Sequence, residues 1–190
     1  YSEINSLLAG SDDAELKEKY AEVSGQLPII KELADILYKN KKNRGCPELE
    51  TSESKLIIND EDICVGVERR TRGRSEEIIE DFMLVANECA ARFGMDNNLP
   101  FVYRIHEEPS DEKLESLREA LVKLNVQYKL GEKACPGDMS EILKAAKGTD
   151  IDLIMNNIVL RSMSKARYST EPVGHFGLAL EDYAHFTSPI

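Results

Sequence analysis

Two histidines and several hydroxyl side chains near the end of the sequence are candidates for a polar binding surface. His175 and His185 lie among tyrosine, phenylalanine, serine and threonine residues, and residues 161–190 contain few acidic side chains. The same composition suits a buried polar corner in which every hydroxyl is hydrogen-bonded, so both interpretations stay open on these residues alone. Guanidinium and hydroxyl groups are typical contacts of phosphate and ribose oxygens, and this stretch offers Arg161, Arg167, Ser169, Thr170, Thr187 and Ser188.

The same stretch also raises the question of a metal site. His175, His185 and Asp182 could in principle converge, but two histidines ten residues apart match no established ligand spacing. The four cysteines are widely scattered and form no Cys-x-x-Cys pair, which argues against both zinc and a disulfide framework. We therefore predict no metal site in the chain and a reducing, cytoplasmic compartment.

A carboxylate on a largely apolar helix is the second candidate for chemistry. Residues 75–93 form a strong helical pattern, in which we expect Cys89 to be a small core side chain. Asp81, Glu88 and Arg92 share one line of that helix, and we expect this line to face solvent. Glu80 lies on a different line and needs a partner or a ligand there. Alternatively, Glu80 simply stabilises the start of the helix through the helix dipole.

The net charge of −11 and the pI near 4.9 count against nucleic-acid binding by the molecule as a whole. The charge is unevenly spread, however, and local potential matters more than the total. Basic side chains gather in three places, around residues 39–44, 69–74 and 161–167. The first of these we interpret as a solvated helix end.

The elements that must position these residues indicate an α/β fold in which helices predominate. With 190 residues and 42% hydrophobic content, the chain is large enough for a single domain with a core. No apolar run is long enough to span a bilayer, and no secretory signal follows Tyr1, so we expect an internal piece of a protein. We predict helices over residues 1–9, 11–44 (interrupted near Gly25 and Pro28), 75–93, 110–124, 138–146 and 150–163, and strands over residues 55–58, 63–67, 101–106 and 126–130.

Several short motifs, taken in order, resemble the RNB catalytic domain of the ribonuclease II and ribonuclease R family. The first is Tyr1 with its following helix start, and the second is the Ile-Glu-Asp-Phe-Met-Leu string at residues 79–84 with Ala-Asn-Glu at 86–88. The third is Tyr-Arg-Ile-His-Glu at residues 103–107. The last group occupies residues 161–163, 166–169, 174–178 and 185–190.

The resemblance implies a processive 3′→5′ exoribonuclease that releases nucleoside 5′-monophosphates with the help of Mg²⁺. It implies that Glu80 holds the ribose of the RNA 3′ end, where a carboxylate can accept a hydrogen bond from the 2′-hydroxyl. Tyr1 would orient the 3′-terminal nucleotide near the scissile phosphate. Leu49 falls where family members can carry a phenylalanine that stacks on bases, and leucine lacks the π-face that contributes about 1–3 kcal/mol per base.

The resemblance also predicts what the chain lacks. The aspartates that hold Mg²⁺ are expected before Tyr1, and an arginine segment is expected after Ile190, so the chain would be the middle of an RNB domain and inactive by itself. Its partner would be the single-stranded 3′ end of RNA, with no membrane and no obligate protein partner. The alternative is a non-catalytic, soluble module that binds RNA or protein.

Overall fold

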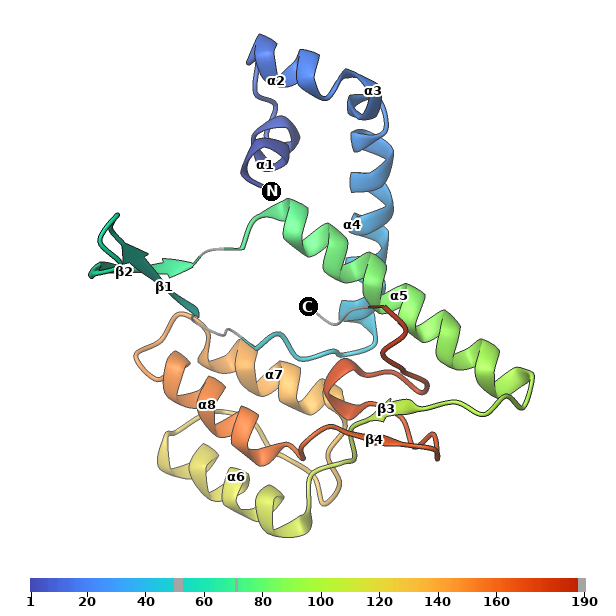
Figure 1. Ribbon diagram of the computed structural model, residues 1–190. Coiled ribbons are helices and arrows are strands. Elements are labelled where there is room, and N and C mark those ends of the chain that lie inside the picture. The colour runs from blue at the N-terminus through green and yellow to red at the C-terminus, as the bar shows by residue number, and fades with distance from the viewer. Residues whose placement is uncertain (50–52, 71, 188–190) are drawn as a thin grey trace. The chain divides into compact units, whose positions relative to one another are not determined.

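The computed structural model describes residues 1–49, 53–70 and 72–187. The chain divides into two compact units. Unit 1 comprises Tyr1–Ala34 and Glu50–Glu80, and unit 2 comprises Asp35–Leu49 and Asp81–Ile190. Helices form most of the regular structure, as predicted, and two of them, α4 and α5, contribute one part to each unit (Figure 1).

Unit 1 begins with short helices. Helix α1 (Ser2–Leu8) ends before Gly10, which has a positive φ of 87°, as expected for a helix stop. The long helix predicted over residues 11–44 is three helices, α2 (Ala14–Lys19), α3 (Ala21–Ser24) and α4 (Leu27–Asn43). Asp13 is the N-cap of α2 and accepts hydrogen bonds from two backbone amides. The interruption before α4 confirms the expected effect of Gly25 and Pro28.

A β-hairpin completes unit 1. Strands β1 (Glu53–Ile58) and β2 (Cys64–Arg70) pair antiparallel, with Leu56 opposite Val67 and a register shift between Ile57 and Ile58. This confirms the hairpin that the two β-branched runs predicted. Five of its apolar side chains are more than half exposed: Leu56, Ile58, Ile63, Val65 and Val67.

Helix α5 (Arg74–Asp96) confirms the strongest helical prediction, but two of its residues were misassigned. Asp81 is only 5% exposed, although we expected it on the solvent face. It is buried because Lys41 of α4 supplies a cation 3.8 Å away in unit 2. Cys89 is exposed, although we expected it in the core. Cys89 lies two residues, and hence about 200°, around the helix from the buried Asn87.

The main hydrophobic core lies in unit 2. Helices α6 (Asp111–Lys123), α7 (Pro136–Ala146) and α8 (Asp152–Ser162) pack together through a cluster of leucine, isoleucine, methionine and valine side chains (Figure 1). Leu117, Met139 and Val159 are fully buried there. The predicted helices over residues 110–124, 138–146 and 150–163 are therefore confirmed, within a residue or two at their ends. Ser110 occupies the N-cap of α6 without a side-chain hydrogen bond.

The second sheet is smaller than the sequence indicates. Strand β3 (Tyr103–Ile105) pairs antiparallel with β4 (Arg167–Ser169), which was not predicted, and Phe176–Leu178 form a single 3₁₀ turn. The strand predicted over residues 126–130 is wrong. That segment alternates in burial but pairs with no strand among the described residues. The Tyr128 amide donates to the Val126 carbonyl at 2.9 Å in a local turn, and the Tyr128 hydroxyl donates to Asp138 of α7 at 2.6 Å. Among the helices formed by described residues, none combines the length and apolar composition that crossing a membrane requires.

Candidate functional site

Tyr1 and Glu80, the two predicted catalytic residues, both belong to unit 1. Tyr1 precedes α1, and its side chain is 63% exposed and thus accessible to a ligand. Glu80 is half-buried in the second turn of α5, where Arg72 Nη1 lies 3.3 Å from its carboxylate. The side chain of Glu80 retains 33% of its accessible surface. Both groups can therefore reach a bound molecule, and the structure shows neither of them fully enclosed.

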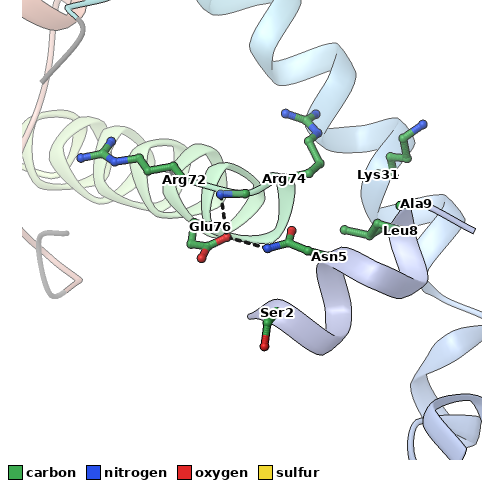
Figure 2. Close-up of a pocket in the computed structure, with 9 residues that line it drawn as sticks. Ser2, Asn5, Leu8, Ala9, Lys31, Arg72, Arg74 and Glu76 are labelled. Carbon is green, nitrogen blue, oxygen red and sulfur yellow. Dashed lines mark hydrogen bonds between the residues drawn. The ribbon is translucent and has the colours of Figure 1, made fainter. Parts of the chain in front are cut away.

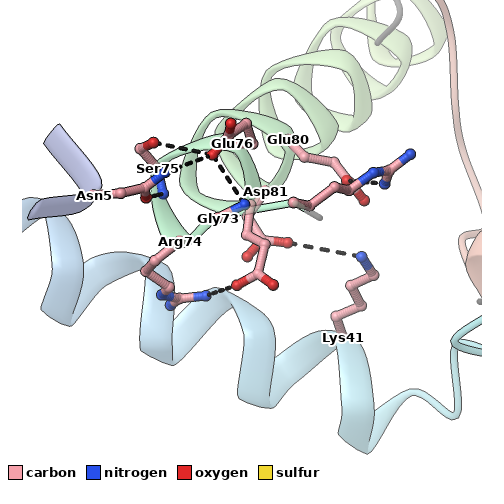
Figure 3. A network of polar contacts seen from close by, with 10 residues as sticks. Asn5, Lys41, Gly73, Arg74, Ser75, Glu76, Glu80 and Asp81 are labelled. Carbon is pink, nitrogen blue, oxygen red and sulfur yellow. Dashed lines mark hydrogen bonds and ion pairs between the residues drawn. The ribbon is translucent and has the colours of Figure 1, made fainter. Parts of the chain in front are cut away.

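A polar network joins α1 to the first turn of α5 (Figure 3). Asn5 Oδ1 accepts a hydrogen bond from the Ser75 backbone amide at 2.7 Å, and Asn5 Nδ2 donates to Glu76 Oε2 at 3.0 Å. The same carboxylate oxygen accepts from the Gly73 amide at 3.1 Å. The hydroxyl of Ser75 donates to the carbonyl of Tyr1 at 3.3 Å. The hydrogen bond from Asn5 is the largest of the effects that lower the pKa of Glu76, so this carboxylate is ionised at neutral pH.

The network forms one wall of a pocket of about 530 Å³ within unit 1 (Figure 2). Three cations, Lys31, Arg72 and Arg74, also line it. Two of these cations are paired with carboxylates of α5, because Arg72 contacts Glu80 and Arg74 contacts Glu77 at 2.9 Å. The pocket is consequently close to neutral, and its polar groups are largely occupied by each other.

In unit 2, Asn87 of α5 holds the C-terminal segment. Its side chain is 1% exposed. Its Oδ1 accepts hydrogen bonds from the amides of Phe186 (3.1 Å) and Thr187 (2.7 Å) and from the Thr187 hydroxyl (3.0 Å). Its Nδ2 donates to the hydroxyl of Tyr183 at 3.2 Å. The predicted RNA-binding residue Thr187 thus uses its hydroxyl within the fold, leaving its methyl group and carbonyl for other contacts.

His106 anchors the start of the same segment. Its Nδ1 accepts from the Gly177 amide at 2.9 Å, so the neutral ring carries its proton on Nε2. Two backbone hydrogen bonds, from His106 to the Gly174 carbonyl (3.0 Å) and from Phe176 to the His106 carbonyl (2.8 Å), add to this attachment. Burial lowers the pKa of His106, and the nearby Ser164 carbonyl offsets part of that shift without forming a well-aligned hydrogen bond.

His175 packs edge-to-face against both His106 and Tyr183, with ring centroids 5.1 and 5.2 Å away. Its Nδ1 is buried without a hydrogen-bond partner among the described residues. Burial, reinforced by the neighbouring His106, lowers the pKa of His175 to about 3. His175 is therefore neutral at physiological pH and cannot meet a phosphate as a cation.

The rings continue outward toward solvent. His185 lies 5.7 Å from the Tyr183 ring, and its Nδ1 shares a 2.8 Å hydrogen bond with the hydroxyl of Tyr168. The guanidinium of Arg104 lies 4.8 Å from the Tyr168 ring centroid, in a cation–π contact. Burial, followed by the charge of Arg104, lowers the pKa of His185. Tyr168 is 57% exposed and offers the accessible aromatic face of this series.

The remaining predicted contacts lie in less specialised surroundings. Arg167 pairs with Glu107 at 3.0 Å on the surface, and Ser169 Oγ accepts a hydrogen bond from the Glu171 amide at 2.9 Å. Thr170 and Arg161 are exposed. Leu49 packs against the main core of unit 2, which gives it a structural role. Ser188 lies outside the described residues.

The side chains that could bind a metal are dispersed. Among the described residues, no group of three histidine, cysteine, aspartate or glutamate side chains lies close enough to hold a metal ion. Asp182, the carboxylate that might have joined the two histidines, is 3.8 Å from Arg92. The donor set of this part of the chain therefore does not fit a metal site.

Comparison with known proteins decides the family. The model of the RNB domain matches residues 1–190. The chain belongs to the RNB domain family. Ribonuclease R 1 of Lactococcus lactis is 39% identical over 194 residues, which cover 100% of this chain and 23% of that protein. The structure of Mycoplasma genitalium RNase R in complex with ribose-methylated single-stranded RNA matches with a TM-score of 0.87 at 27% identity, covering 100% of this chain and 29% of that one.

Yeast Ssd1, described as a pseudonuclease, shares the fold alone. Its TM-score is 0.62 at 18% identity over 85% of this chain and 21% of its own. A related fold therefore occurs in a protein described as a pseudonuclease. The RNB chain itself spans 23% of the length of the Lactococcus lactis relative.

Sequence reasoning missed two positioning residues in this RNB chain, Asn87 and His106. Both belong to the motifs that carry the resemblance, but neither was given a role. Asn87 lies on the same helical line as Glu80, seven residues away, and a polar side chain on a buried line was the available signal. His106 follows a buried strand directly, but its partners Gly174 and Gly177 are about 70 residues distant in sequence, so no local pattern indicated the pairing.

Proposed function

We propose that this RNB chain is part of a processive 3′→5′ exoribonuclease that hydrolyses RNA to nucleoside 5′-monophosphates. The observation that carries the proposal is the match of the RNB domain model to every residue of the chain. The relatives that support it are ribonucleases R. Its substrate would be the single-stranded 3′ end of RNA.

Glu80 and Tyr1 would contact the 3′-terminal nucleotide. The Glu80 carboxylate, a third exposed, would accept a hydrogen bond from the ribose 2′-hydroxyl and so distinguish RNA from DNA. Its ion pair with Arg72 is partly exposed, and such pairs contribute only about 0–1 kcal/mol, so a ribose can compete for the carboxylate. The accessible ring of Tyr1 would lie against the terminal base or sugar.

In unit 2, we propose that RNA contacts come from Leu49, Arg167, Ser169, Thr170, His175, Thr187 and Ser188. Arg167 is exposed and could exchange Glu107 for a phosphate. His175, being neutral, would contribute a hydrogen bond or ring contact rather than a charge. The exposed Tyr168 ring adds a surface on which a base can stack.

The reaction would use a divalent metal, Mg²⁺ by family resemblance, which activates water and stabilises charge on the phosphate when bound. Because no described group of side chains fits a metal, its ligands would come from other parts of a longer protein. All four cysteines are free thiols, which supports a reducing, cytoplasmic environment.

The test of Glu80 is discrimination between ribose and deoxyribose ends. In the full-length protein that contains this chain, Glu80→Ala should reduce the preference for an RNA over a 2′-deoxy 3′ end by roughly 10- to 100-fold, because a hydrogen bond to a charged group contributes about 1.5–3 kcal/mol. The matched control is Glu77→Ala, which removes an exposed carboxylate one turn away on the same helix. If the Glu80→Ala variant still rejects the deoxyribose end as strongly as wild type, Glu80 is purely structural.

The second candidate function is a non-catalytic RNA-binding or protein-interaction module. The lack of a metal-binding group among the described residues favours it for the chain by itself. We expect the 190-residue chain, incubated with labelled single-stranded RNA and Mg²⁺ or Mn²⁺, to release no mononucleotides. Mononucleotide release that co-purifies with the chain would refute this expectation. Absence of cleavage by the full-length protein, with RNA binding retained, would establish the module.

A further inference from the structure

The attachment of α1 to α5 has a functional consequence. We propose that Asn5 and Glu76 are positioning residues that hold Tyr1 at a fixed distance from Glu80 within unit 1. The inference rests on the proposed function, in which Tyr1 and Glu80 contact the 3′-terminal nucleotide of RNA. It concerns residues that contact neither the substrate nor the reacting atoms.

The argument begins with helical spacing. Asn5 follows Tyr1 by four residues, and the Asn5 amide donates to the Tyr1 carbonyl at 2.8 Å. Glu80 follows Glu76 by four residues on α5. Residues four apart lie on the same face of a helix, about 6 Å along its axis. Tyr1 and Glu80, the two residues proposed to contact the RNA end, are thus each one helical turn from a residue of the network. Tyr1 is one turn from Asn5, and Glu80 is one turn from Glu76.

Hydrogen bonds between Asn5 and the start of α5 join those two helical turns. Asn5 bonds to both Ser75 and Glu76, which lie 70 and 71 residues away in sequence, at 2.7 and 3.0 Å (Figure 3). Asn5 uses its oxygen as an acceptor and its nitrogen as a donor, so both ends of one amide are fixed. The Ser75 hydroxyl adds a direct bond to the Tyr1 carbonyl. Any shift of α1 along α5 would break several of these bonds together.

Two further observations show that the contact between Asn5 and the start of α5 depends on close polar geometry. A Cβ atom on Gly73 would lie 2.1 Å from Asn5 Nδ2, so only glycine allows the asparagine to approach this closely. Helix α1 itself contains no buried residue. Its attachment therefore depends on polar contacts more than on apolar packing. Glu3 bonds to Lys19 and Tyr20, and the network joins α1 to α5, the helix that carries Glu80.

The charge of Glu76 allows a pair of substitutions that exchanges the donor and the acceptor between Asn5 and Glu76. Glu76 is an ionised acceptor that takes hydrogen bonds from Asn5 and Gly73, and it shares the single proton of the Ser75 hydroxyl with the Tyr1 carbonyl. Asn5→Asp would place a second carboxylate 3.0 Å from it and remove the donor. In the double variant Asn5→Asp with Glu76→Gln, the aspartate accepts from Ser75 and from the new glutamine amide, and the repulsion between two carboxylates is removed. The link is restored with donor and acceptor exchanged. The Gly73 amide loses its acceptor, because the oxygen that serves it in the wild type is the one that faces Asn5.

The experiment uses the full-length protein that contains this chain, with single-stranded RNA ending in ribose or 2′-deoxyribose. We expect Asn5→Asp to lower kcat about 10- to 100-fold, since small misplacement of reacting groups costs this much, while KM stays within about twofold because contacts farther along the RNA persist. The double variant should recover kcat to within a few-fold of wild type. Ser6→Ala, an exposed hydroxyl on the same helix, is the control and should change nothing.

Three results would overturn the proposal. They are an unchanged kcat in Asn5→Asp, a double variant as slow as Asn5→Asp, and a kcat loss that merely follows the fraction unfolded at the assay temperature. Glu80→Ala, run in parallel, separates this inference from the proposed function. If Glu80→Ala changes end discrimination and Asn5→Asp does not, only the positioning role fails. If the wild type leaves RNA uncut, the ratio of Kd values for the two ends takes the place of kcat, and an unchanged ratio in Asn5→Asp counts against the proposal.

Discussion

Replacing Asn87 with alanine should release the C-terminal segment of unit 2. The substitution removes one acceptor that serves three donors of Phe186 and Thr187, and one donor that serves Tyr183. The main effect should therefore fall on residues 186–187 and on the buried tyrosine, with the helical core around α6, α7 and α8 unaffected.

The magnitude follows from the exposure of each group. Phe186 is 69% exposed, so water can take the place of Asn87 as the acceptor for its amide. The loss of that bond therefore costs little stability. Tyr183 is 6% exposed, and leaving its hydroxyl unpaired costs about 1–3 kcal/mol. Adding about 0.5–1.5 kcal/mol for each of the two lost bonds to Thr187 gives roughly 2–6 kcal/mol. Local opening should increase by about thirtyfold or more, and by about a hundredfold at a loss near 3 kcal/mol, since about 1.4 kcal/mol is a factor of ten.

Amide hydrogen exchange measures this opening residue by residue. Asn87→Ala should accelerate exchange at Thr187 by about a hundredfold while amides of α7 keep wild-type rates. Two variants dissect the effect. Tyr183→Phe removes only the other end of the single bond that Asn87 donates and should cost about 1 kcal/mol. Asn87→Asp keeps the acceptor but places a carboxylate at a position that is 1% exposed, so it should cost more than Tyr183→Phe. Wild-type exchange at Thr187 in Asn87→Ala would refute the reasoning, because the segment would then be held by other contacts.

Two further outcomes are expected. In chemical denaturation, Gly45→Ala should destabilise unit 2 by several kcal/mol more than Gly148→Ala. Both glycines have φ near +75° to +79°, but only at Gly45 would a Cβ meet backbone, 2.8 Å from Gly137 Cα. Equal losses of stability in the two variants would contradict the packing argument. The pKa of His175 is lowered to about 3 in the folded protein, against about 6.5 in the unfolded chain. Its contribution to the free energy of unfolding is therefore constant above about pH 6.5, and stability is lost as the pH falls from there toward 3. Between about pH 7.5 and pH 5 the wild type should lose about 2 kcal/mol more than His175→Phe, and parallel pH profiles of the two proteins would show that His175 is not the titrating group.

The parts of the fold that the sequence predicted well depend on neighbours close in the chain. The helices predicted over residues 75–93 and 110–124 are each determined by residues within a few turns of one another. The hairpin over β1 and β2 is equally local, since only a short turn separates its strands. Local periodicity and turn chemistry sufficed for each of these elements.

The misassignments share the opposite property. Asp81 is buried beside Lys41 of another helix. Residues 126–130 lie against the helical core, where Val126 and Tyr128 pack, and they have no partner strand among the described residues. Strand β4 exists only through its pairing with β3, which lies more than sixty residues earlier in the chain. The roles of Asn87 and His106 are likewise set by distant backbone groups. A sequence shows which side chains need partners, but a fold is required to say which partners they have.

The hairpin of unit 1 also affects how the protein behaves in solution. Both β1 and β2 have an outer edge without a neighbouring strand among the described residues, and apolar side chains on them are exposed. Such edges can template sheet growth between molecules. Copies of the chain, each with a net charge of −11, repel one another, and added salt screens this repulsion, with a Debye length of about 10 Å at 0.1 M. Light scattering of concentrated samples should therefore rise with ionic strength, so that low-salt buffers, rather than high-salt ones, keep the chain monodisperse.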